Sequence, residues 1–415
     1  MTTISRQDGM DFFADSFLPK REVVIQYAAV TEQGRLEVVI NGETLQYPGV
    51  WVRQNCQCAK CFNPTCQSYI SSLKDITFGN LELQSATASA MGDVVRCVHN
   101  DGHITEFDAY WLYNRRMTEN GIKERYANMT ICELVSWPNP SEMVVTEISY
   151  AEVTETYRGF EIFGDALIRD GIVIVTDAPN GKVFNDFSQK TGLVGTANHY
   201  GFDWIVKNEP NPTNHAYTTA ELELHTDQPY LYNTPNIQVL HTIKQATRGG
   251  ENVMSDGVKA SLVLKERKPD YYRLLTTSGF IFEDVISHKS HDPQFYITRS
   301  SPVINLNEKG EPAVIQWNNA CRSSFFNGSP EDYENLMEAS LEFYKILHEF
   351  AIEISNKPGD MMIFDNKRIL HGRKSFQCEE QRLIEGWYFD WDMLYSFLRV
   401  AKIKKSKDEN MLIDA

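Results

Sequence analysis

Short stretches of alternating apolar and polar residues run through the first third of the chain. The segments at 23–27, 36–40 and 94–98 are rich in Val and Ile, and Asn-Gly or Asp-Gly pairs follow the last two closely. A period of two is typical of a strand with one buried face, and these pairs are typical of hairpin turns. We therefore predict a small β-rich domain over residues 1–120.

The pattern changes in the segment 121–149, which is polar and contains Trp137-Pro-Asn-Pro-Ser. Such a composition is typical of a linker. Beyond it, apolar residues recur at helical spacing over 154–169, and Asp170-Gly171 would end that helix. A second helix is predicted over 183–196. A new domain therefore begins near residue 150.

Short apolar runs then predict strands, interrupted by one long helix over 330–355. The predicted strands cover residues 172–175, 237–243, 280–282, 314–317, 361–364 and 383–389. Helices that flank many short strands imply an α+β domain built around an antiparallel sandwich or barrel. We place this domain at 150–401, and a polar tail at 402–415.

Composition narrows the class of protein. The chain has 415 residues, of which 42% are hydrophobic, and its net charge is −16. This negative charge opposes non-specific binding to nucleic acid or anionic membranes. No apolar run is long enough to span a bilayer, and residues 1–20 resemble neither a signal peptide nor a transit peptide. We expect a cytoplasmic protein that binds neither nucleic acid nor membranes.

Three of the eight cysteines lie close together, at Cys56, Cys58 and Cys61. In a long chain this spacing is more typical of metal ligands than of disulfides. A structural zinc ion would stabilise a small domain directly, because its hydrophobic core is limited. Three free thiols are the alternative. On spacing alone the candidates for a fourth ligand are Cys66, Cys97, His99 and His103.

The main candidate for chemistry is His225-Thr226-Asp227. On an extended segment the imidazole and the carboxylate point to the same side, where they can bind one metal ion. His371, which follows a predicted strand and the Asp365-Asn366 turn, offers a second imidazole. Two histidines and one carboxylate on one face of an iron ion leave its other positions open for reactants.

Arg382 directly precedes the predicted strand at 383–389, and its side chain would lie on the same face of that strand as Tyr388. A buried arginine is costly unless it meets an anion, and its planar fork suits a carboxylate. An ion pair with Glu385 or Asp390 is the alternative, although Glu385 would lie on the opposite face.

These residues resemble those of the non-haem iron, 2-oxoglutarate-dependent oxygenases. The resemblance lies in His225-Thr226-Asp227, in Asp-Asn-x-Arg-x-Leu-His-Gly-Arg around His371, and in Arg-x-x-Glu-Gly from Arg382. It implies a double-stranded β-helix (jelly-roll) oxygenase domain with flanking helices. Iron(II) would be held by His225, Asp227 and His371, and the far carboxylate of 2-oxoglutarate by Arg382.

More narrowly, nearly the whole chain resembles the γ-butyrobetaine dioxygenase family. That family has an N-terminal zinc domain with Asn-Cys-x-Cys-x-x-Cys and a later Asp-x-His-x-x-x-Phe, which match residues 55–61 and 101–107. The resemblance selects His103 as the fourth zinc ligand. It implies O2-dependent hydroxylation of γ-butyrobetaine to L-carnitine, the last step of carnitine biosynthesis, while 2-oxoglutarate is decarboxylated to succinate and CO2. It also implies a homodimer and ascorbate as reductant.

The same resemblance implies how a substrate would be held. A quaternary ammonium group donates no hydrogen bonds and is bound best by aromatic faces. The family's aromatic cage matches Tyr200, Trp204, Tyr217 and Tyr388, and its two carboxylate-binding amides match Asn214 and Asn318. Asn252 lies where the family often adds a polar group for 2-oxoglutarate, and its role stays open.

Two alternatives remain. Trimethyllysine dioxygenase, or another betaine oxygenase, would use the same chemistry, although trimethyllysine dioxygenase has an aspartate where Asn214 stands. An amide there favours the betaine. A catalytically inactive, zinc-organised binding protein would have lost a metal ligand or the arginine, and none is visibly lost.

Overall fold

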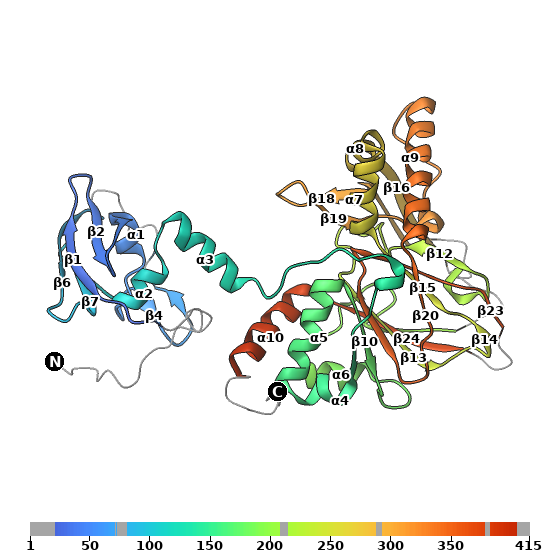
Figure 1. The fold of residues 1–415 in the computed structure, drawn as a ribbon, viewed down its shortest axis with the longest axis horizontal. Coiled ribbons are helices and arrows are strands. Elements are labelled where there is room, and N and C mark those ends of the chain that lie inside the picture. Colours follow the sequence, from blue (N-terminus) through green and yellow to red (C-terminus); the bar gives the residue numbers. More distant parts are fainter. Residues whose placement is uncertain are drawn as a thin grey trace. The chain divides into compact units, whose positions relative to one another are not determined.

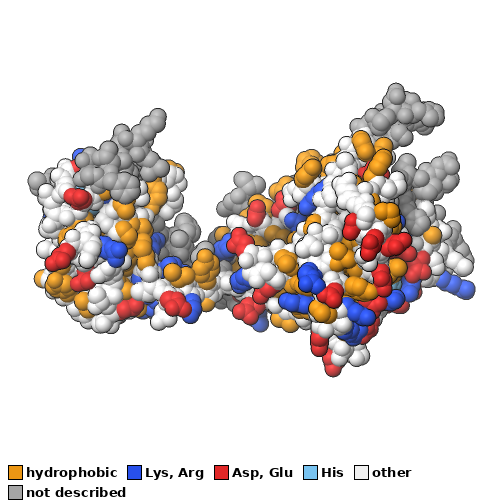
Figure 2. Space-filling view, turned by 90° about the horizontal axis from the view of Figure 1, so that it is seen from above, with side chains coloured by type: hydrophobic (Ala, Val, Ile, Leu, Met, Phe, Trp, Pro, Cys, Tyr) orange, Lys and Arg blue, Asp and Glu red, His pale blue; other side chains and the backbone are white. Residues whose placement is uncertain are grey.

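Two compact units make up the chain, residues 1–130 and 131–415. The computed structural model (Figure 1) describes residues 21–70, 72, 81–207, 215–287, 293–377 and 382–404. No helix within these ranges is long and apolar enough to cross a membrane. Acidic and basic side chains are interspersed on the face shown in Figure 2.

The N-terminal unit contains two antiparallel three-stranded sheets, as predicted for a small β-rich domain. The first sheet consists of β1 (Ile25–Val30), β2 (Arg35–Ile40) and β3 (Glu43–Pro48), and the second of β6 (Leu83–Ala88), β7 (Val94–His99) and β8 (Ile104–Asp108). The remaining elements are α1 (Gly49–Gln54), β4 (Phe62–Asn63), β5 (Ser68–Tyr69), α2 (Ala109–Asn114) and α3 (Glu119–Met129). Their buried side chains form one hydrophobic core.

Two facing groups of strands form the frame of the second unit. A six-stranded sheet has the order β11 (Asp203–Val206), β24 (Leu383–Phe389), β13 (Ile237–Lys244), β21 (Met361–Asp365), β10 (Ile172–Thr176) and β9 (Glu147–Ser149). A four-stranded sheet has the order β12 (Leu222–His225), β22 (Ile369–Arg373), β15 (Asn252–Asp256) and β20 (Ile352–Ile354). Apart from the β9–β10 pair, neighbouring strands in both sheets run antiparallel. This confirms the α+β jelly-roll architecture.

Alternation along β13 and β24 decides which side chains reach the site. Val239 and Trp387 pack into a core that also contains residues of α5 and α10. Their neighbours Gln238 and Tyr388 point the other way and line a cavity. The period of two in the sequence thus separates a hydrophobic side from a functional side of the same sheet.

Helices cover the strands in two groups. The first core contains residues of α4 (Tyr150–Glu155), α5 (Tyr157–Asp170), α6 (Phe184–Thr191) and α10 (Trp391–Lys404). The second contains residues of α7 (Gly257–Arg267), α8 (Pro269–Thr277) and α9 (Pro330–Glu349). Figure 1 shows α7, α8 and α9 grouped together, away from α5 and α10.

Separate two-stranded pairs complete the sheet structure of this unit. They are the strand pairs β14 (Arg248–Gly249) with β23 (Phe376–Gln377), β16 (Gly279–Ser287) with β17 (Pro293–Pro302), and β18 (Ile304–Leu306) with β19 (Pro312–Ile315). Single turns of 3-10 helix lie at η4 (Pro140–Glu142), η5 (His215–Tyr217) and η6 (Asn319–Cys321).

Several predicted boundaries need correction. The interval 121–149 is not a simple linker, because it contains most of α3, where the Thr118 hydroxyl caps the helix, and β9, which pairs with β10. The long helix ends at Glu349, since the alternating segment from Ile352 to Ile354 forms a strand. The second unit continues through α10 to Lys404, so only part of the predicted tail at 402–415 lies among the described residues.

Candidate active site

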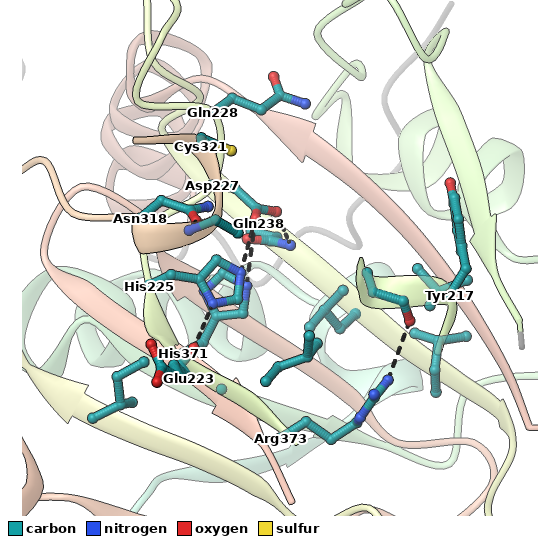
Figure 3. A pocket seen from close by; sticks show the side chains of 18 of the residues that line it. Tyr217, Glu223, His225, Asp227, Gln228, Gln238, Asn318, Cys321, His371 and Arg373 are labelled. Atoms are coloured by element: carbon teal, nitrogen blue, oxygen red, sulfur yellow. Dashed lines mark hydrogen bonds and ion pairs between the residues drawn. The ribbon is translucent and has the colours of Figure 1, made fainter. Parts of the chain in front are cut away.

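His225 and His371 lie directly opposite each other on the antiparallel strands β12 and β22. Cross-strand neighbours bring their side chains within contact distance, and the two ring centroids are 4.2 Å apart. The Oδ1 atom of Asp227 lies 3.3 Å from His225 Nε2 and 3.8 Å from His371 Nε2. Figure 3 shows the three side chains converging. The structure therefore brings the three predicted iron ligands together.

The electrostatics of these groups suit metal binding. His225 Nδ1 donates to the Glu223 carbonyl over 2.8 Å, which turns Nε2 toward Asp227. Burial alone would lower the pKa of His225, but the hydrogen bond with Asp227 and its negative charge raise it, so a metal ion would displace a proton from Nε2. Burial, and then the charge of His225, lowers the pKa of His371 to about 3. Burial alone would raise the pKa of Asp227, but the charge of His371 and the hydrogen bond from His225 lower it below its usual range. A neutral imidazole and an ionised carboxylate are the forms that bind a metal.

Backbone contacts fix the position of this motif. The Asp227 N–H donates to Asn366 Oδ1 over 2.7 Å, and Asn366 Nδ2 donates to the Asp227 carbonyl over 3.1 Å. The Thr226 N–H donates to the Trp317 carbonyl over 2.7 Å. Gln228 has a positive φ of 54°, so the chain turns sharply after the carboxylate. Asn366, buried completely, was not predicted to have this role.

Two buried guanidinium groups form a cationic end of the pocket. Arg382 is 6% exposed, and its Nε donates to Gln245 Oε1 over 3.1 Å. Arg373 lies near it, and both guanidinium groups stack on the Phe376 ring, at 4.7 Å for Arg373 and 5.5 Å for Arg382. Burial, and then the charge of Arg382, lowers the pKa of Arg373 to about 10. Two buried like charges are costly alone and fit a bound carboxylate.

Glu385 does lie on the opposite face from Arg382, as the strand period predicts. It is completely buried and accepts hydrogen bonds from the Val183 N–H at 2.8 Å and from His241 Nδ1 at 3.2 Å. Asp390 accepts from Asn236 Nδ2 at 2.7 Å. Each of the two acids that could have paired with Arg382 therefore has other partners.

Aromatic side chains line the pocket beside the metal ligands. Trp204 and Tyr388 are in contact, with ring centroids 4.4 Å apart. Gly386 makes this possible, because a Cβ there would approach the Trp204 ring to 2.7 Å. The lining includes the four predicted cage residues Tyr200, Trp204, Tyr217 and Tyr388, together with Tyr230, which was not predicted.

The structure describes only some of the amide side chains that were predicted to bind substrate or co-substrate. Asn318 lines the pocket, and its Nδ2 donates to the Thr226 carbonyl over 3.4 Å. Asn252, whose role was left open, also lines it. Asn214 lies outside the described residues. The cavity that all these residues share measures about 660 Å³, a size typical of small-molecule sites.

The site fits iron(II) and 2-oxoglutarate. The donor atoms of His225, Asp227 and His371 all lie within 4.8 Å of one another, and their nitrogen and oxygen chemistry suits a non-haem iron ion. The guanidinium group of Arg382 suits the far carboxylate of the co-substrate. When bound, iron and 2-oxoglutarate supply oxygen activation coupled to decarboxylation, and the chain orients the reactants and limits access of water.

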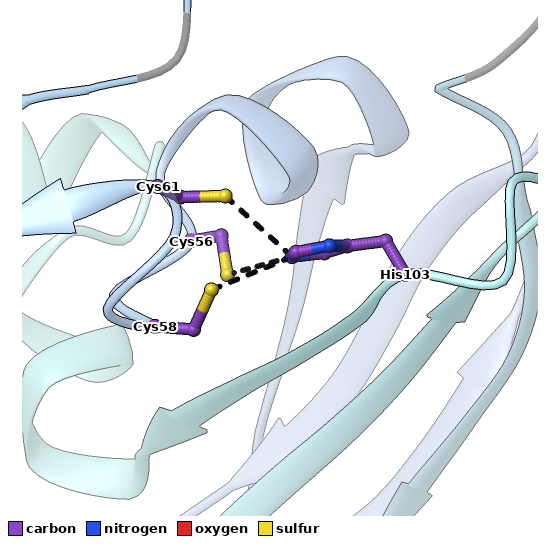
Figure 4. A group of neighbouring side chains, drawn as sticks. All are labelled: Cys56, Cys58, Cys61 and His103. Atoms are coloured by element: carbon purple, nitrogen blue, oxygen red, sulfur yellow. Dashed lines mark hydrogen bonds between the residues drawn. The ribbon is translucent and has the colours of Figure 1, made fainter.

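A second cluster lies in the N-terminal unit. Cys56, Cys58, Cys61 and His103 point toward one another (Figure 4), with the three Sγ atoms 3.2, 3.8 and 3.7 Å from His103 Nε2. Tetrahedral zinc with its usual bond lengths would place sulfur and nitrogen about 3.5 Å apart. The geometry is therefore compatible with zinc and brings His103 into the site.

The other candidate ligands lie elsewhere. His99 is fully buried, and its Nε2 lies 3.0 Å from the Thr105 hydroxyl. Cys97 is buried in the core, whereas Cys66 is exposed. Arg53 Nη1 donates to Cys61 Sγ over 3.4 Å, which stabilises a thiolate.

Metal analysis tests this second cluster. We expect Cys58→Ser to lose about one equivalent of zinc and to destabilise the N-terminal unit by several kcal/mol, because binding at such sites contributes to folding. Cys66→Ser, at an exposed cysteine outside the cluster, should keep its zinc and its melting temperature. Equal metal content in the wild type and Cys58→Ser would contradict the assignment.

The jelly roll with a two-histidine, one-carboxylate site defines the class of protein, a non-haem iron oxygenase. Residues 140–388 match the model of the taurine catabolism dioxygenase TauD, TfdA family. The chain belongs to this family. Residues 29–113 match a second model, described as gamma-butyrobetaine hydroxylase-like, N-terminal. Both units of the chain thus have counterparts among known families.

Two curated relatives agree with this assignment. Gamma-butyrobetaine dioxygenase of Pongo abelii is 29% identical over 91% of this chain and 97% of its own length. The mitochondrial trimethyllysine dioxygenase of Bos taurus is 25% identical over 90% of this chain and 86% of its own length. A solved asparagine oxygenase in complex with Fe(II) has a TM-score of 0.45 and 16% identity, covering 68% of this chain and 84% of that one. The two curated relatives are named for different substrates.

Proposed function

We propose that this dioxygenase hydroxylates γ-butyrobetaine to L-carnitine, with iron(II) and 2-oxoglutarate bound at the site described above. The observation that carries the proposal is the aromatic wall beside the metal ligands, above all the contact between Trp204 and Tyr388. Aromatic faces bind a trimethylammonium group without hydrogen bonds. Relatives with this activity match the chain over nearly its whole length. The cytoplasmic location, the homodimer and the benefit from ascorbate stay predictions.

Charge in the pocket supports a cationic substrate. Glu283 and Asp284 line the cavity on β16, and Asp284 Oδ2 lies 3.4 Å from His199 Nε2. Asp284 also lies close to Tyr230 in the aromatic wall. Burial of Tyr230, and then the negative charge of Asp284, raises the pKa of Tyr230. A carboxylate at this place attracts a cation, whereas the arginines attract the dicarboxylate.

The same acid also gives a reason for a second candidate, trimethyllysine dioxygenase. Burial, and then the negative charge of Asp284, raises the pKa of Cys321, which lines the pocket at η6, close to Asn318. Trimethyllysine carries an additional ammonium group that could pair with an acid at this end. Asn318 instead suits the carboxylate of γ-butyrobetaine, because its amide can donate a hydrogen bond.

Purified full-length protein decides between the two substrates. With iron(II), 2-oxoglutarate and ascorbate supplied, we expect kcat/KM for γ-butyrobetaine to exceed that for trimethyllysine by at least about tenfold, which corresponds to about 1.4 kcal/mol. A preference for trimethyllysine would assign the second function. Turnover of neither compound would contradict both.

Asp284→Asn tests the electrostatic argument. We expect the variant to bind γ-butyrobetaine about fivefold more weakly, because a partly exposed charge pair contributes roughly 1 kcal/mol. Its affinity for the uncharged isostere, in which a tert-butyl group replaces the trimethylammonium group, should stay unchanged. Glu283→Gln removes the neighbouring charge and serves as the matched control.

Three results would separate the explanations for Asp284. Equal losses for the cation and the isostere would mean that Asp284 acts through structure and not through charge. Equal effects of Asp284→Asn and Glu283→Gln would indicate that the overall negative potential of the pocket, and not Asp284 in particular, attracts the cation. Weaker binding of trimethyllysine alone would place Asp284 beside the additional ammonium group and favour the second function.

A further inference from the structure

The two oxygen atoms of Asp227 have different surroundings. Oδ1 faces the two histidines, at 3.3 Å from His225 Nε2 and 3.8 Å from His371 Nε2. Oδ2 accepts two hydrogen bonds, one from Gln238 Nε2 at 2.8 Å and one from the Tyr388 hydroxyl at 2.7 Å. The carboxylate is therefore held so that one oxygen points to the metal position and the other to the wall of the pocket.

We infer that Gln238 and Tyr388 are positioning residues that occupy Oδ2 and so present Asp227 to the metal through Oδ1 alone. A carboxylate can bind a metal through one oxygen or through both. If Oδ2 also bound, it would take a position that the reactants need. Two donors on Oδ2 oppose this, because hydrogen bonds to a charged oxygen are stronger than those between neutral groups and would be lost if Oδ2 turned to the metal.

The sheet register explains how both donors reach one oxygen. Gln238 on β13 and Tyr388 on β24 are direct partners across the antiparallel pair. Their side chains leave the same face of the sheet at short spacing. Each residue is only 2% exposed, so water competes little for Oδ2. Gln238 has no counterpart among the residues predicted from sequence.

Tyr388 thereby has two tasks that use different atoms. Its ring contacts Trp204 in the proposed cation cage, and its hydroxyl holds the metal carboxylate. Replacement by Phe removes the second task and keeps the ring. The inference concerns the metal and therefore does not depend on which substrate the enzyme hydroxylates.

Titration with Mn(II) of iron-free protein that keeps its zinc, followed by electron paramagnetic resonance, tests the inference without turnover. Mn(II) favours oxygen and nitrogen ligands over the thiolates of the other cluster. We expect Gln238→Met and Tyr388→Phe each to weaken Mn(II) binding about tenfold, and the double variant up to about 100-fold, the range typical when partners of metal ligands are removed. The spectrum of bound Mn(II) should also change, because the carboxylate is free to rotate.

Two matched variants control for the loss of a buried hydrogen bond elsewhere. Gln316 is buried and donates to the Thr234 hydroxyl over 3.1 Å, and Tyr150 donates to Asp186 Oδ2 over 2.8 Å. Gln316→Met and Tyr150→Phe should bind Mn(II) within about twofold of the wild type, well below the tenfold loss expected at the site.

The contrary outcomes are distinct. Wild-type affinity in Gln238→Met and Tyr388→Phe, or equal weakening in the two controls, would overturn the positioning role. A wild type that binds no Mn(II) would overturn the metal site itself. Failure of the proposed substrate assignment would instead appear only in turnover and would leave these affinities unchanged.

Discussion

Replacing His371 by Ala is expected to lower turnover roughly a thousandfold or more. The Nε2 atom of His371 lies 3.8 Å from Asp227 Oδ1, where a shared metal ion would bind. A catalytic metal contributes several kcal/mol to a reaction, and each 1.4 kcal/mol corresponds to about tenfold in rate. The measurement is succinate formation from 2-oxoglutarate, together with Mn(II) affinity.

His348→Ala is the matched control, because this histidine lies on α9 and contacts Tyr344 edge to face, with ring centroids 4.4 Å apart. It removes an imidazole of the same unit that is not among the three proposed metal ligands. Circular dichroism and thermal unfolding establish that both variants fold. Substantial activity in folded His371→Ala would show that this histidine does not hold the catalytic metal.

Arg382→Met is expected to raise the KM for 2-oxoglutarate by at least about 30-fold. Losing one partner of a buried, hydrogen-bonded charge pair costs about 2–5 kcal/mol. Arg382 is 6% exposed, so water replaces little of the lost interaction. Initial rates measured against 2-oxoglutarate concentration give the KM directly.

Two further variants sharpen this result. Arg382→Lys keeps the charge and loses the planar fork. Its KM for 2-oxoglutarate should therefore lie between that of the wild type and that of Arg382→Met. Arg267→Met removes an exposed ion pair between Arg267 on α7 and Glu349 on α9, and should leave the KM unchanged. A KM for 2-oxoglutarate that does not respond to Arg382→Met would assign the far carboxylate to another residue, of which Arg373 is the nearest candidate.

Much of the site follows from strand periodicity in the sequence. Arg382 and Tyr388 lie six positions apart, an even offset that puts both side chains on one face of the strand, and both line the cavity. His225 and Asp227 were expected on one side of an extended segment, and both converge with His371. The resemblance to known oxygenases selected His103 where spacing alone left four candidates, and the structure brings it to the three cysteines.

Other residues depend on the pairing of distant strands. The register of β13 and β24 places Gln238 opposite Tyr388, so that both side chains reach Asp227. No local pattern within β13 predicts that register. Arg373 follows His371 by two residues, so the period of two could have indicated it. Asp284 enters the pocket from β16, part of a two-stranded antiparallel pair with β17.

Helix boundaries show the same limit. α7 (Gly257–Arg267) and α8 (Pro269–Thr277) were not predicted, because much of their stability comes from packing on α9 and β19. α3 is mostly polar, and we interpreted most of it as a linker. The cap at Thr118 was the local signal for its start.

Simultaneous measurement of succinate and L-carnitine tests the proposed function most directly. Full-length protein would be supplied with iron(II), 2-oxoglutarate, O2 and γ-butyrobetaine. We predict equal amounts of the two products, with neither formed when iron is withheld, and with both formed at least about 30-fold more slowly when Arg382→Met is assayed at low 2-oxoglutarate. Succinate formation without any hydroxylated product from γ-butyrobetaine or trimethyllysine would contradict the assignment of this pocket to a trimethylammonium substrate.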